Sequence, residues 1–352
     1  IVVRYLRVFL VGILTVWWGV AAPASSFPPW GIIHNSLIQS QQTIMIGVNP
    51  TGNLNTPNGA GTTATNSLNV NISQANSGSV GISYYWPGAK KVGTTGTYAK
   101  GWYDSTSQGK KWESWGAGAL DNRGAQAWGS ASIESAGVVN MTVKSFVVDP
   151  TSIKSTVWIN DTSGNPMLEV THLYGPTSGD TNQNLFQGLV TITNISNDTL
   201  QDVRYRRMMD WDILENVLDP SVDAVGVKAS YNSSTNPKIW SYCDNGGESI
   251  SAPYTQANPF IACKPWNNAS LNQDYVGQTG GASAQYGTGS SFDFQFGKLP
   301  CNSSVTFYIY YGAAGSRTAL SNPNDPQNPG AMERVGATVY SMAYDPNYPT
   351  LA

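Results

Sequence analysis

The sequence predicts an all-β protein, an antiparallel β-sandwich of the Ig-like or jelly-roll-like kind, with a hydrophobic N-terminal segment in front of it. Short apolar runs rich in branched and aromatic residues alternate with Gly, Pro, Asn and Asp along most of the 352 residues, which is the pattern of strands and turns. No convincing run with a period of 3.6 follows residue 22. No clean repeat of 20 to 50 residues is present, so the sequence does not support a propeller or a solenoid.

The expected strands follow from this alternation of apolar runs and turn residues. They are residues 43–48, 79–86, 138–148, 155–159, 168–174, 185–196, 199–213, 305–313 and 337–343. Two of them, 185–196 and 199–213, alternate apolar and polar residues on both sides of a polar turn at NISND. This pattern predicts a hairpin in which one face of each strand is buried.

The N-terminus supports export. Arg4 and Arg7 precede an apolar run from Val8 to Ala22, and the small residues of PASS follow it, as in a secretory signal peptide. Fifteen helical residues would reach only about 22 Å, less than the roughly 30 Å of a bilayer core. The sequence leaves three readings open: a removable signal, a retained assembly helix like that of pilin-type subunits, and a membrane anchor.

The expected organisation has four parts. Residues 1–26 form the hydrophobic N-terminal segment, and residues 27–41, with three prolines nearby and a polar SLIQSQQ, read as a linker. Residues 42–150 form an aromatic-rich β region, and residues 151–346 form a C-terminal β-sandwich region. The formal charge of −3 and pI near 5.4 offer no basic surface for nucleic acid. Low charge with abundant Asn, Ser, Thr, Gly and Tyr is typical of secreted β proteins.

The stretch RYRRMMDWDI, residues 204–213, concentrates charge in a chain of which only 12% is charged. On a strand, Val203, Tyr205, Arg207, Met209, Trp211 and Ile213 would share a core face, and Asp202, Arg204, Arg206, Met208, Asp210 and Asp212 the other. Asp210 and Asp212 would lie about 6.5 to 7 Å apart, a spacing within the range of paired glycosidase carboxylates. They could equally bind calcium with Glu215. Structural pairing between the arginines and carboxylates is the reading we favour.

Other candidate sites give weaker signals. Asp180 begins a calcium-like DTNQN, but position 12 of such a loop is Thr191 where a glutamate is wanted. His34 in the expected linker and His172 in an expected strand have no second ligand at a metal spacing, and we expect His172 to be a satisfied strand residue. No nucleophile elbow, P-loop or dinucleotide motif is present. We therefore expect no catalytic residue and no cofactor, with calcium as the one metal that these weak candidates could bind.

Cysteines, sequons and aromatic residues complete the candidate set. Cys243 and Cys263 would close a polar loop by a disulfide, with Cys301 unpaired, although three buried thiols are the alternative. Sequons that predict N-glycosylation begin at Asn71, Asn140, Asn160, Asn194, Asn197, Asn232, Asn268 and Asn302. Aromatic residues that could bind a glycan or form a subunit interface include Trp86, Trp102, Trp112 and Trp115. β-Sheet cores use the same residue types as packing mass.

Several phrases together resemble a group of secreted microbial β-sandwich surface proteins that often carry PEP-CTERM-type sorting signals. They are IGVNPTGNLNTPNG, ESWGAG with WGSAS, LEVTHLYGP with NLFQGLVTITNIS, DVRYRRMMDWDI, FDFQFGKLPCNSSVTFYIYYGAA and GATVYSMA, over residues 43–343. The resemblance implies an exported β-sandwich at the cell surface or in extracellular matrix, and it carries no assigned activity. The sequence ends at YPTLA without the sorting helix of that group, which leaves the mode of attachment open.

These observations together predict an extracellular or cell-surface protein without enzymatic activity. We expect a glycosylated structural subunit that self-associates into a filament or surface layer. A secreted carbohydrate-binding protein is the alternative, and a glycosidase built on Asp210 and Asp212 is the third reading.

Overall fold

The protein is seen in a computed structural model that describes residues 27–38, 43–56, 80–86, 90–92, 96–98, 101–106, 113–132, 137–178, 184–211, 224–228, 239–243, 257–261, 264–265, 288–313, 334–335 and 340–344. For some strand residues, among them Trp86, Asp210, Trp211 and Cys243, only the backbone is described. Within these ranges no helix is long and apolar enough to span a membrane.

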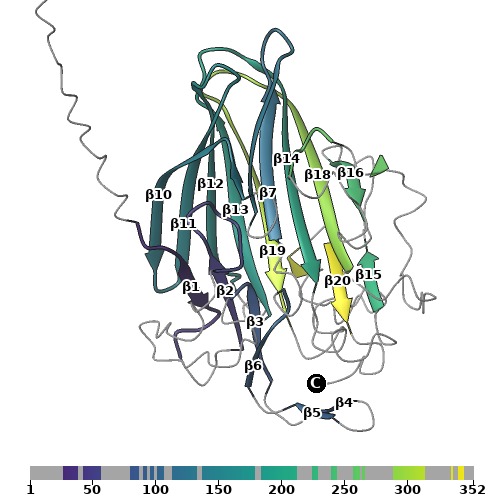
Figure 1. The fold of residues 1–352 in the computed structure, drawn as a ribbon. Helices are drawn as coiled ribbons and strands as arrows, with labels where there is room; N and C mark the ends of the chain where they lie inside the picture. The colour runs from purple at the N-terminus through teal and green to yellow at the C-terminus, as the bar shows by residue number, and fades with distance from the viewer. Residues whose placement is uncertain are drawn as a thin grey trace, which may run out of the picture.

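Two antiparallel sheets face each other and form the body of the protein (Figure 1). The five-stranded sheet has the order β10 (Met141–Asp149), β11 (Ser152–Asn160), β12 (Pro166–Pro176), β13 (Leu185–Asn194) and β19 (Ser304–Gly312). The seven-stranded sheet has the order β17 (Lys264–Pro265), β16 (Ile239–Cys243), β18 (Thr288–Leu299), β14 (Leu200–Trp211), β7 (Glu113–Leu120), β8 (Gln126–Ser132) and β9 (Val138–Val139). The predicted β-sandwich is confirmed.

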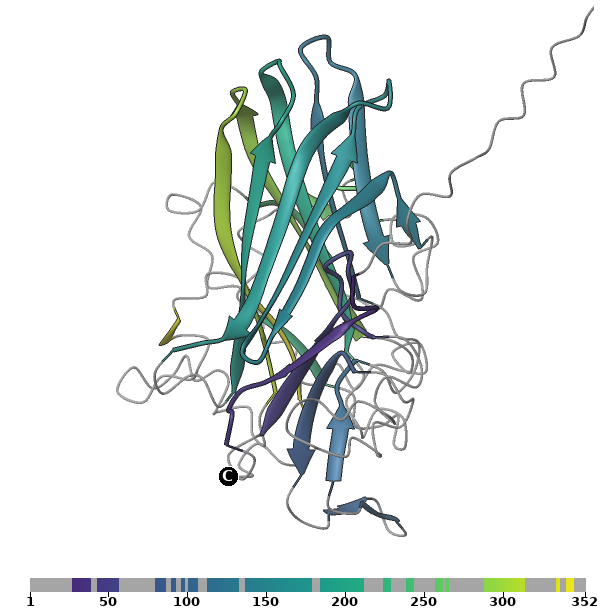
Figure 2. The same cartoon turned by 90° about the vertical axis from the view of Figure 1, so that its left-hand side faces the viewer.

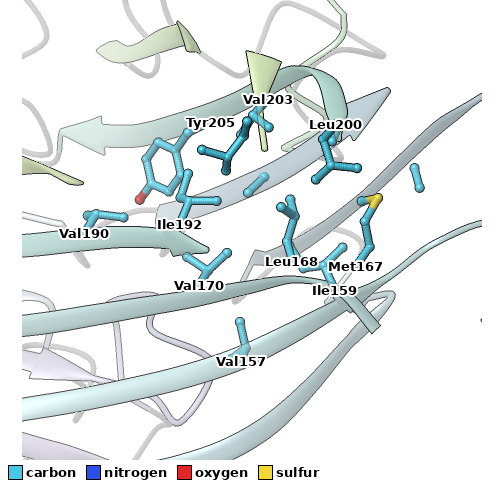
Figure 3. Close-up of a cluster of buried hydrophobic side chains, with 14 of the residues drawn as sticks. Val157, Ile159, Met167, Leu168, Val170, Val190, Ile192, Leu200, Val203 and Tyr205 are labelled. Atoms are coloured by element: carbon cyan, nitrogen blue, oxygen red, sulfur yellow. The ribbon is translucent and has the colours of Figure 1, made fainter. Parts of the chain in front are cut away.

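The main core lies between these two sheets. In Figure 3, Val157, Leu168 and Val190 of the five-stranded sheet approach Val203 and Tyr205 of the seven-stranded sheet. The alternation of buried and more exposed side chains is clearest in β13, where every second residue from Phe186 onward is buried. Burying such side chains stabilises the fold by about 1.5 to 3 kcal/mol each.

A third sheet packs beside the sandwich. It has the order β1 (Gly31–His34), β2 (Ile44–Val48), β3 (Ile82–Trp86) and β6 (Gly101–Asp104). Ile33, Ile44 and Ile46 from this sheet share a second core with Ile153 and Tyr174 of the five-stranded sheet. In Figure 2 the purple N-terminal strands cross the lower half of the teal strands of that sheet. Two further ribbons pair β4 (Lys90–Val92) with β5 (Gly96–Tyr98) and β15 (Ala224–Lys228) with β20 (Tyr340–Tyr344).

The expected linker over residues 27–41 was wrong in part, because it contains β1. Residues 31–34 pair with 45–48, and all four residues of β1 are buried. The apolar Ile32 and Ile33 explain this, because they complete the second and third cores. The boundary expected after residue 150 falls in the turn between β10 and β11, which are paired, and β7 pairs with β14. The two expected regions therefore share both large sheets.

The hairpin expected between residues 185–196 and 199–213 was also wrong. β13 and β14 alternate as predicted, but they belong to opposite sheets. Asn194 at the end of β13 is buried, and its side chain donates hydrogen bonds to the carbonyls of Asp198 and Leu299. Its side-chain oxygen accepts the Ser196 N–H. These bonds direct the chain across the sandwich instead of back along the same sheet.

Strands β7, β8 and β18 were not among the expected strands. β7 and β8 read ESWGAGAL and QAWGSAS, in which Gly, Ala and Ser carry little strand propensity. The small residues have a packing reason. A Cβ on Gly116 would lie 1.8 Å from the carbonyl oxygen of Ala257, and one on Gly118 would lie 2.8 Å from the Phe260 ring. Residues 257–261 therefore lie directly against the outer face of β7.

Candidate functional site

The arginine-rich strand β14 places charged side chains on both of its faces. Val203, Tyr205, Arg207 and Met209 are buried on the core side, which confirms that part of the predicted face. Arg206 on the opposite face is also buried, with 1% of its surface exposed. The segment 257–261 lies over this face. The candidate site is therefore two clusters, one on each side of β14.

The inner cluster joins Arg207 to Glu113 at the start of β7. Arg207 Nε lies 2.5 Å from Glu113 Oε1, and both side chains are buried. Arg207 also donates to the hydroxyl of Tyr205 at 3.1 Å, and Tyr311 donates to Glu113 at 3.3 Å. The second oxygen of Glu113 accepts the backbone N–H of Leu54 at 2.6 Å. The buried acceptor predicted for Arg207 is thus a carboxylate, 94 residues earlier in the sequence.

The same cluster holds the loop between β2 and Leu54. The Trp115 indole donates to the carbonyl of Thr51 at 2.9 Å, and Ser155 donates to the carbonyl of Pro50 at 2.6 Å. Tyr174 donates to the carbonyl of Gly52 at 2.7 Å. Three strands from two sheets therefore bind consecutive carbonyls of this loop, which we call the anchor loop (residues 49–54). Because Leu54 also contacts Glu113, the anchor loop ties the four-stranded sheet to the sandwich.

His172 lies beneath the anchor loop. Its Nε2 is 3.0 Å from the Tyr205 hydroxyl, and its ring stacks on that of Tyr174 with centroids 5.8 Å apart. Gly52 has a φ of 82°, and a Cβ there would lie 2.9 Å from His172 Nδ1. The histidine is a packed strand residue, as expected, but the expectation that it is satisfied was wrong in part, because its buried Nδ1 has no hydrogen-bond partner among the described residues.

Burial sets the electrostatics of the inner cluster. It raises the pKa of Glu113, although Arg207 opposes the shift. Burial lowers the pKa of His172 well below its ordinary value, and the charge of Arg207 adds to this, so the imidazole is neutral at pH 7. Burial raises the pKa of Tyr205 to about 12, against the opposing effect of Arg207. The Glu113 carboxylate holds the pKa of Arg207 well above its ordinary value although burial works against it. Arg207 is therefore the permanent charge of this cluster.

The outer cluster is a cross-strand pair. Arg206 faces Asp293 of β18 in the sheet register, and its Nε and Nη2 lie 2.5 and 2.7 Å from the two carboxylate oxygens. Arg206 also donates to the carbonyl of Ile261. Arg204 pairs with Asp202 at 2.7 Å and lies over the Phe260 ring at 4.9 Å. Cross-strand and same-face pairing, the structural interpretation favoured for this stretch, is present on this face.

The arrangement joins elements of the fold, and the ion pairs at the centre of both clusters are buried. Glu113, Arg207, His172 and Asp293 are all buried, and each contacts another part of the chain. General acid–base chemistry needs a proton donor or acceptor within hydrogen-bond reach of a substrate. Among the described residues no three His, Cys, Asp or Glu side chains come close enough together to hold a metal ion.

Several candidate residues lie outside the described part. They are Asp180 and Asp212, the side chains of Asp210, Trp211, Trp86 and Cys243, and also Cys263, Trp112, Asn71, Asn232 and Asn268. The calcium, glycosidase and Cys243–Cys263 disulfide hypotheses stay predictions. Cys301, in the turn between β18 and β19, carries a free thiol.

The sequons differ in their accessibility. Asn194 is fully buried and uses its amide within the fold, so it is excluded as a glycosylation site in the folded protein. Asn140 is exposed, but its amide donates to the carbonyls of Trp128 and Asn160, both at 2.9 Å. Asn160 is half-buried, and Asn197 and Asn302 are exposed in turns. Asn197 and Asn302 are thus the described sequons best placed to accept a glycan.

Two of the aromatic candidates are core residues. Trp115 is fully buried in the main core, and Trp102 is 7% exposed and packs against Tyr85 and His34. Of the alternatives left open for these two tryptophans, the structure shows core packing, and neither forms a glycan or interface surface.

Sequence reasoning missed the partners of the arginines. Glu113 and Asp293 stand alone in apolar or small-residue strands, and neither matches a known spacing. One signal could have found them, because an arginine on a core face requires a buried acceptor, and few acidic residues lie inside strands. A scan against models of known protein families finds no match for this chain, and a search of curated proteins finds no similar sequence.

Proposed function

We propose that the protein is an exported, non-enzymatic structural subunit that self-associates into a cell-surface filament or surface layer and carries N-linked glycans. One observation carries this proposal best: the ionisable side chains of both clusters on β14 are used to fasten one part of the chain to another. Arg207 and Glu113 fasten the anchor loop, and Arg206 fastens residues 257–261. Such internal fastening suits a subunit that must keep its shape outside the cell.

Export and surface location rest on the sequence. A positively charged flank, an apolar run and small residues begin the chain, and neutral polar residues replace charge over the rest. The exposed sequons Asn197 and Asn302 lie in the turns that follow β13 and β18. Ser303 and Asn302 hydrogen-bond Asn194, so both turns lie at the same end of the sandwich. Glycans at these two positions would cover that end and leave the long sheet faces and edges free for assembly.

The test is to purify the protein from its native surface and compare assembly with hydrolysis. We expect negative-stain electron microscopy to show regular polymers or sheets, and intact mass spectrometry to show glycan mass at Asn197 or Asn302. A panel of polysaccharide substrates should give no turnover. A monodisperse monomer that hydrolyses a glycan, with the activity lost in Asp210→Asn, would replace this proposal by the glycosidase reading.

A further inference from the structure

Strand β19 differs from the other described sheet edges. β1, β6, β9 and β17 are edge strands of four residues or fewer. β10 is nine residues long, but Lys144 sits at a register shift in its middle. β19 is also nine residues long and reads SVTFYIYYG, without a charge, a proline or a register shift. Soluble proteins block their edges with short strands, bulges, lysine or proline, and β19 has none of these.

The hydrogen-bonding groups on the free side of β19 can be assigned from its pairing with β13. Asn194 N–H donates to the Ser303 carbonyl, and Ala313 N–H donates to the Asn184 carbonyl. Hydrogen-bonded pairs alternate along an antiparallel ladder, so the odd-numbered residues of β19 bond β13. The N–H and C=O groups of the even-numbered residues therefore point away from the sheet; these are Ser304, Thr306, Tyr308, Tyr310 and Gly312.

Beside this edge, the described residues include aromatic side chains that are only half-buried. β18 and β19 follow one another along the chain but lie in different sheets. Phe294, Phe296 and Phe307 form an aromatic cluster between them, with ring centroids 5.1 to 6.4 Å apart, and all three are only half-buried. On the other face Tyr308 is 54% exposed. A strand added to β19 would find apolar surface on both sides.

We propose that β19 pairs antiparallel with β19 of a second copy, with the two-fold axis at Tyr308, so that the two five-stranded sheets become one continuous sheet. This deepens the self-association on which the proposed function rests. Tyr308 is the central residue of Ser304–Gly312, and its N–H points outward. The centred register therefore forms every available hydrogen bond, and shifting it in either direction leaves an end unpaired.

A second copy is the occupant that this edge fits. In an isologous interface residue i of one copy contacts residue j of the other and j contacts i, so the strand must be complementary to itself. β19 has no charge, and its branched and aromatic residues favour cross-strand pairing with themselves. The same pairing would bring each copy's Phe307 side toward the half-buried cluster of the other.

The register gives distances that can be tested. Residues of a hydrogen-bonded antiparallel pair have Cα atoms about 5.5 Å apart, which is the expected separation of the two Tyr308 residues. Leu173 lies on the same face two strands inward, through Leu189. With about 4.8 Å between strands, the two Leu173 residues would be about 25 Å apart. Leu173 is 38% exposed, so it provides a matched control.

The experiment uses the full chain with Cys301→Ser, to remove the free thiol, and adds Tyr308→Cys or Leu173→Cys. A bis-maleimide linker of about 8 Å should join two chains in the first variant and not in the second. Efficient cross-linking at both positions, or at neither, would overturn the register.

Charge substitutions at the same two positions test the edge itself. We expect light scattering to show that the Cys301→Ser parent self-associates, that Tyr308→Lys loses this by tenfold or more in dissociation constant, and that Leu173→Lys keeps it. Circular dichroism should show that both variants are folded. Assembly that persists in Tyr308→Lys would overturn the β19 contact and leave the structural function standing. A parent chain that stays monomeric at every concentration would count against both.

Discussion

Arg206 and Arg207 are neighbours in the sequence, yet their side chains point to opposite faces of β14. Each is buried, and each meets one carboxylate at 2.5 Å. Arg206 finds its partner on the adjacent strand of the same sheet, and it also binds Ile261 in the segment above. Arg207 reaches Glu113 and, through it, a loop that belongs to a different sheet.

The same kind of buried ion pair therefore stabilises different parts of the fold in the two cases. Both ion pairs join adjacent strands of the seven-stranded sheet, whose register backbone hydrogen bonds already define. They differ in what else they bind, because Arg207 and Glu113 also hold the anchor loop, whose position against the sandwich no backbone ladder specifies. A buried ion pair adds little net stability over apolar residues of similar size, but removing one partner leaves the other as an uncompensated buried charge. We therefore expect the loss of each pair to destabilise a different part of the protein.

The largest effect is expected for Arg207→Met. The substitution leaves the buried Glu113 without its cation, so the free energy of unfolding should fall by about 3–5 kcal/mol in urea titrations. The double variant Arg207→Met with Glu113→Gln should recover part of this loss, because it leaves no buried charge. If the free energy of unfolding of Arg207→Met lay within 1 kcal/mol of wild type, the pair would not be holding the anchor loop against the sandwich.

Arg206→Met should cost about 3 kcal/mol, near the lower end of the same range, because water can reach Asp293 once residues 257–261 move. The location of the damage separates the two arginines. Hydrogen exchange should accelerate at the amides of residues 257–261 and stay slow in the anchor loop. The opposite pattern is expected for Arg207→Met, and uniform acceleration in both variants would contradict the distinction.

Gly52→Ala tests how tightly the anchor loop is held. The residue has a positive φ, which costs alanine about 1–2 kcal/mol, and its new methyl group would press on His172, adding about 1 kcal/mol. Gly164→Ala is the matched control, because its φ is 86° and nothing lies within 4 Å of an added Cβ. Equal losses of stability in the two variants would mean that the anchor loop moves to accommodate the new methyl group next to His172.

The smallest effect is a pH dependence caused by His34, which is buried in β1 against the Trp102 ring. Burial lowers the pKa of His34 to about 4, so the folded state resists protonation while the unfolded chain takes up a proton near pH 6.5. The stability is therefore complete above pH 6.5 and declines as the pH falls toward 4. Between pH 7 and pH 5 the loss from His34 should be about 2 kcal/mol. His34→Phe should remove this part of the slope, and an unchanged pH profile would show that His34 is accessible to water when folded.

Alternation in the sequence was enough to find the fold class and most long strands. Strands such as β11, β12 and β13 combine branched residues with clear periodicity, so local pattern and tertiary structure agree. Alternation did not predict β7 and β8, because their small residues are required by tertiary packing, as where residues 257–261 pack against β7. It was also not enough for the β13–β14 connection, because a buried asparagine amide decides between a hairpin and a crossing. The core face of β14 could be read from periodicity, but the partners of its arginines depend on contacts 87 and 94 residues away.

The anchor loop also has a consequence for the order in which the protein folds. Its carbonyls and amide are bound by Glu113, Trp115, Ser155, Tyr174 and Arg207, at sequence separations from 59 to 155 residues. Contacts between distant residues form slowly, because the intervening chain must first lose its freedom. During synthesis the last of these partners, Arg207, emerges only with β14, so the anchor loop has all of its bonds only after more than half of the chain has been made. If the chain is exported as proposed, this delay would help to keep it unfolded until it has crossed the membrane.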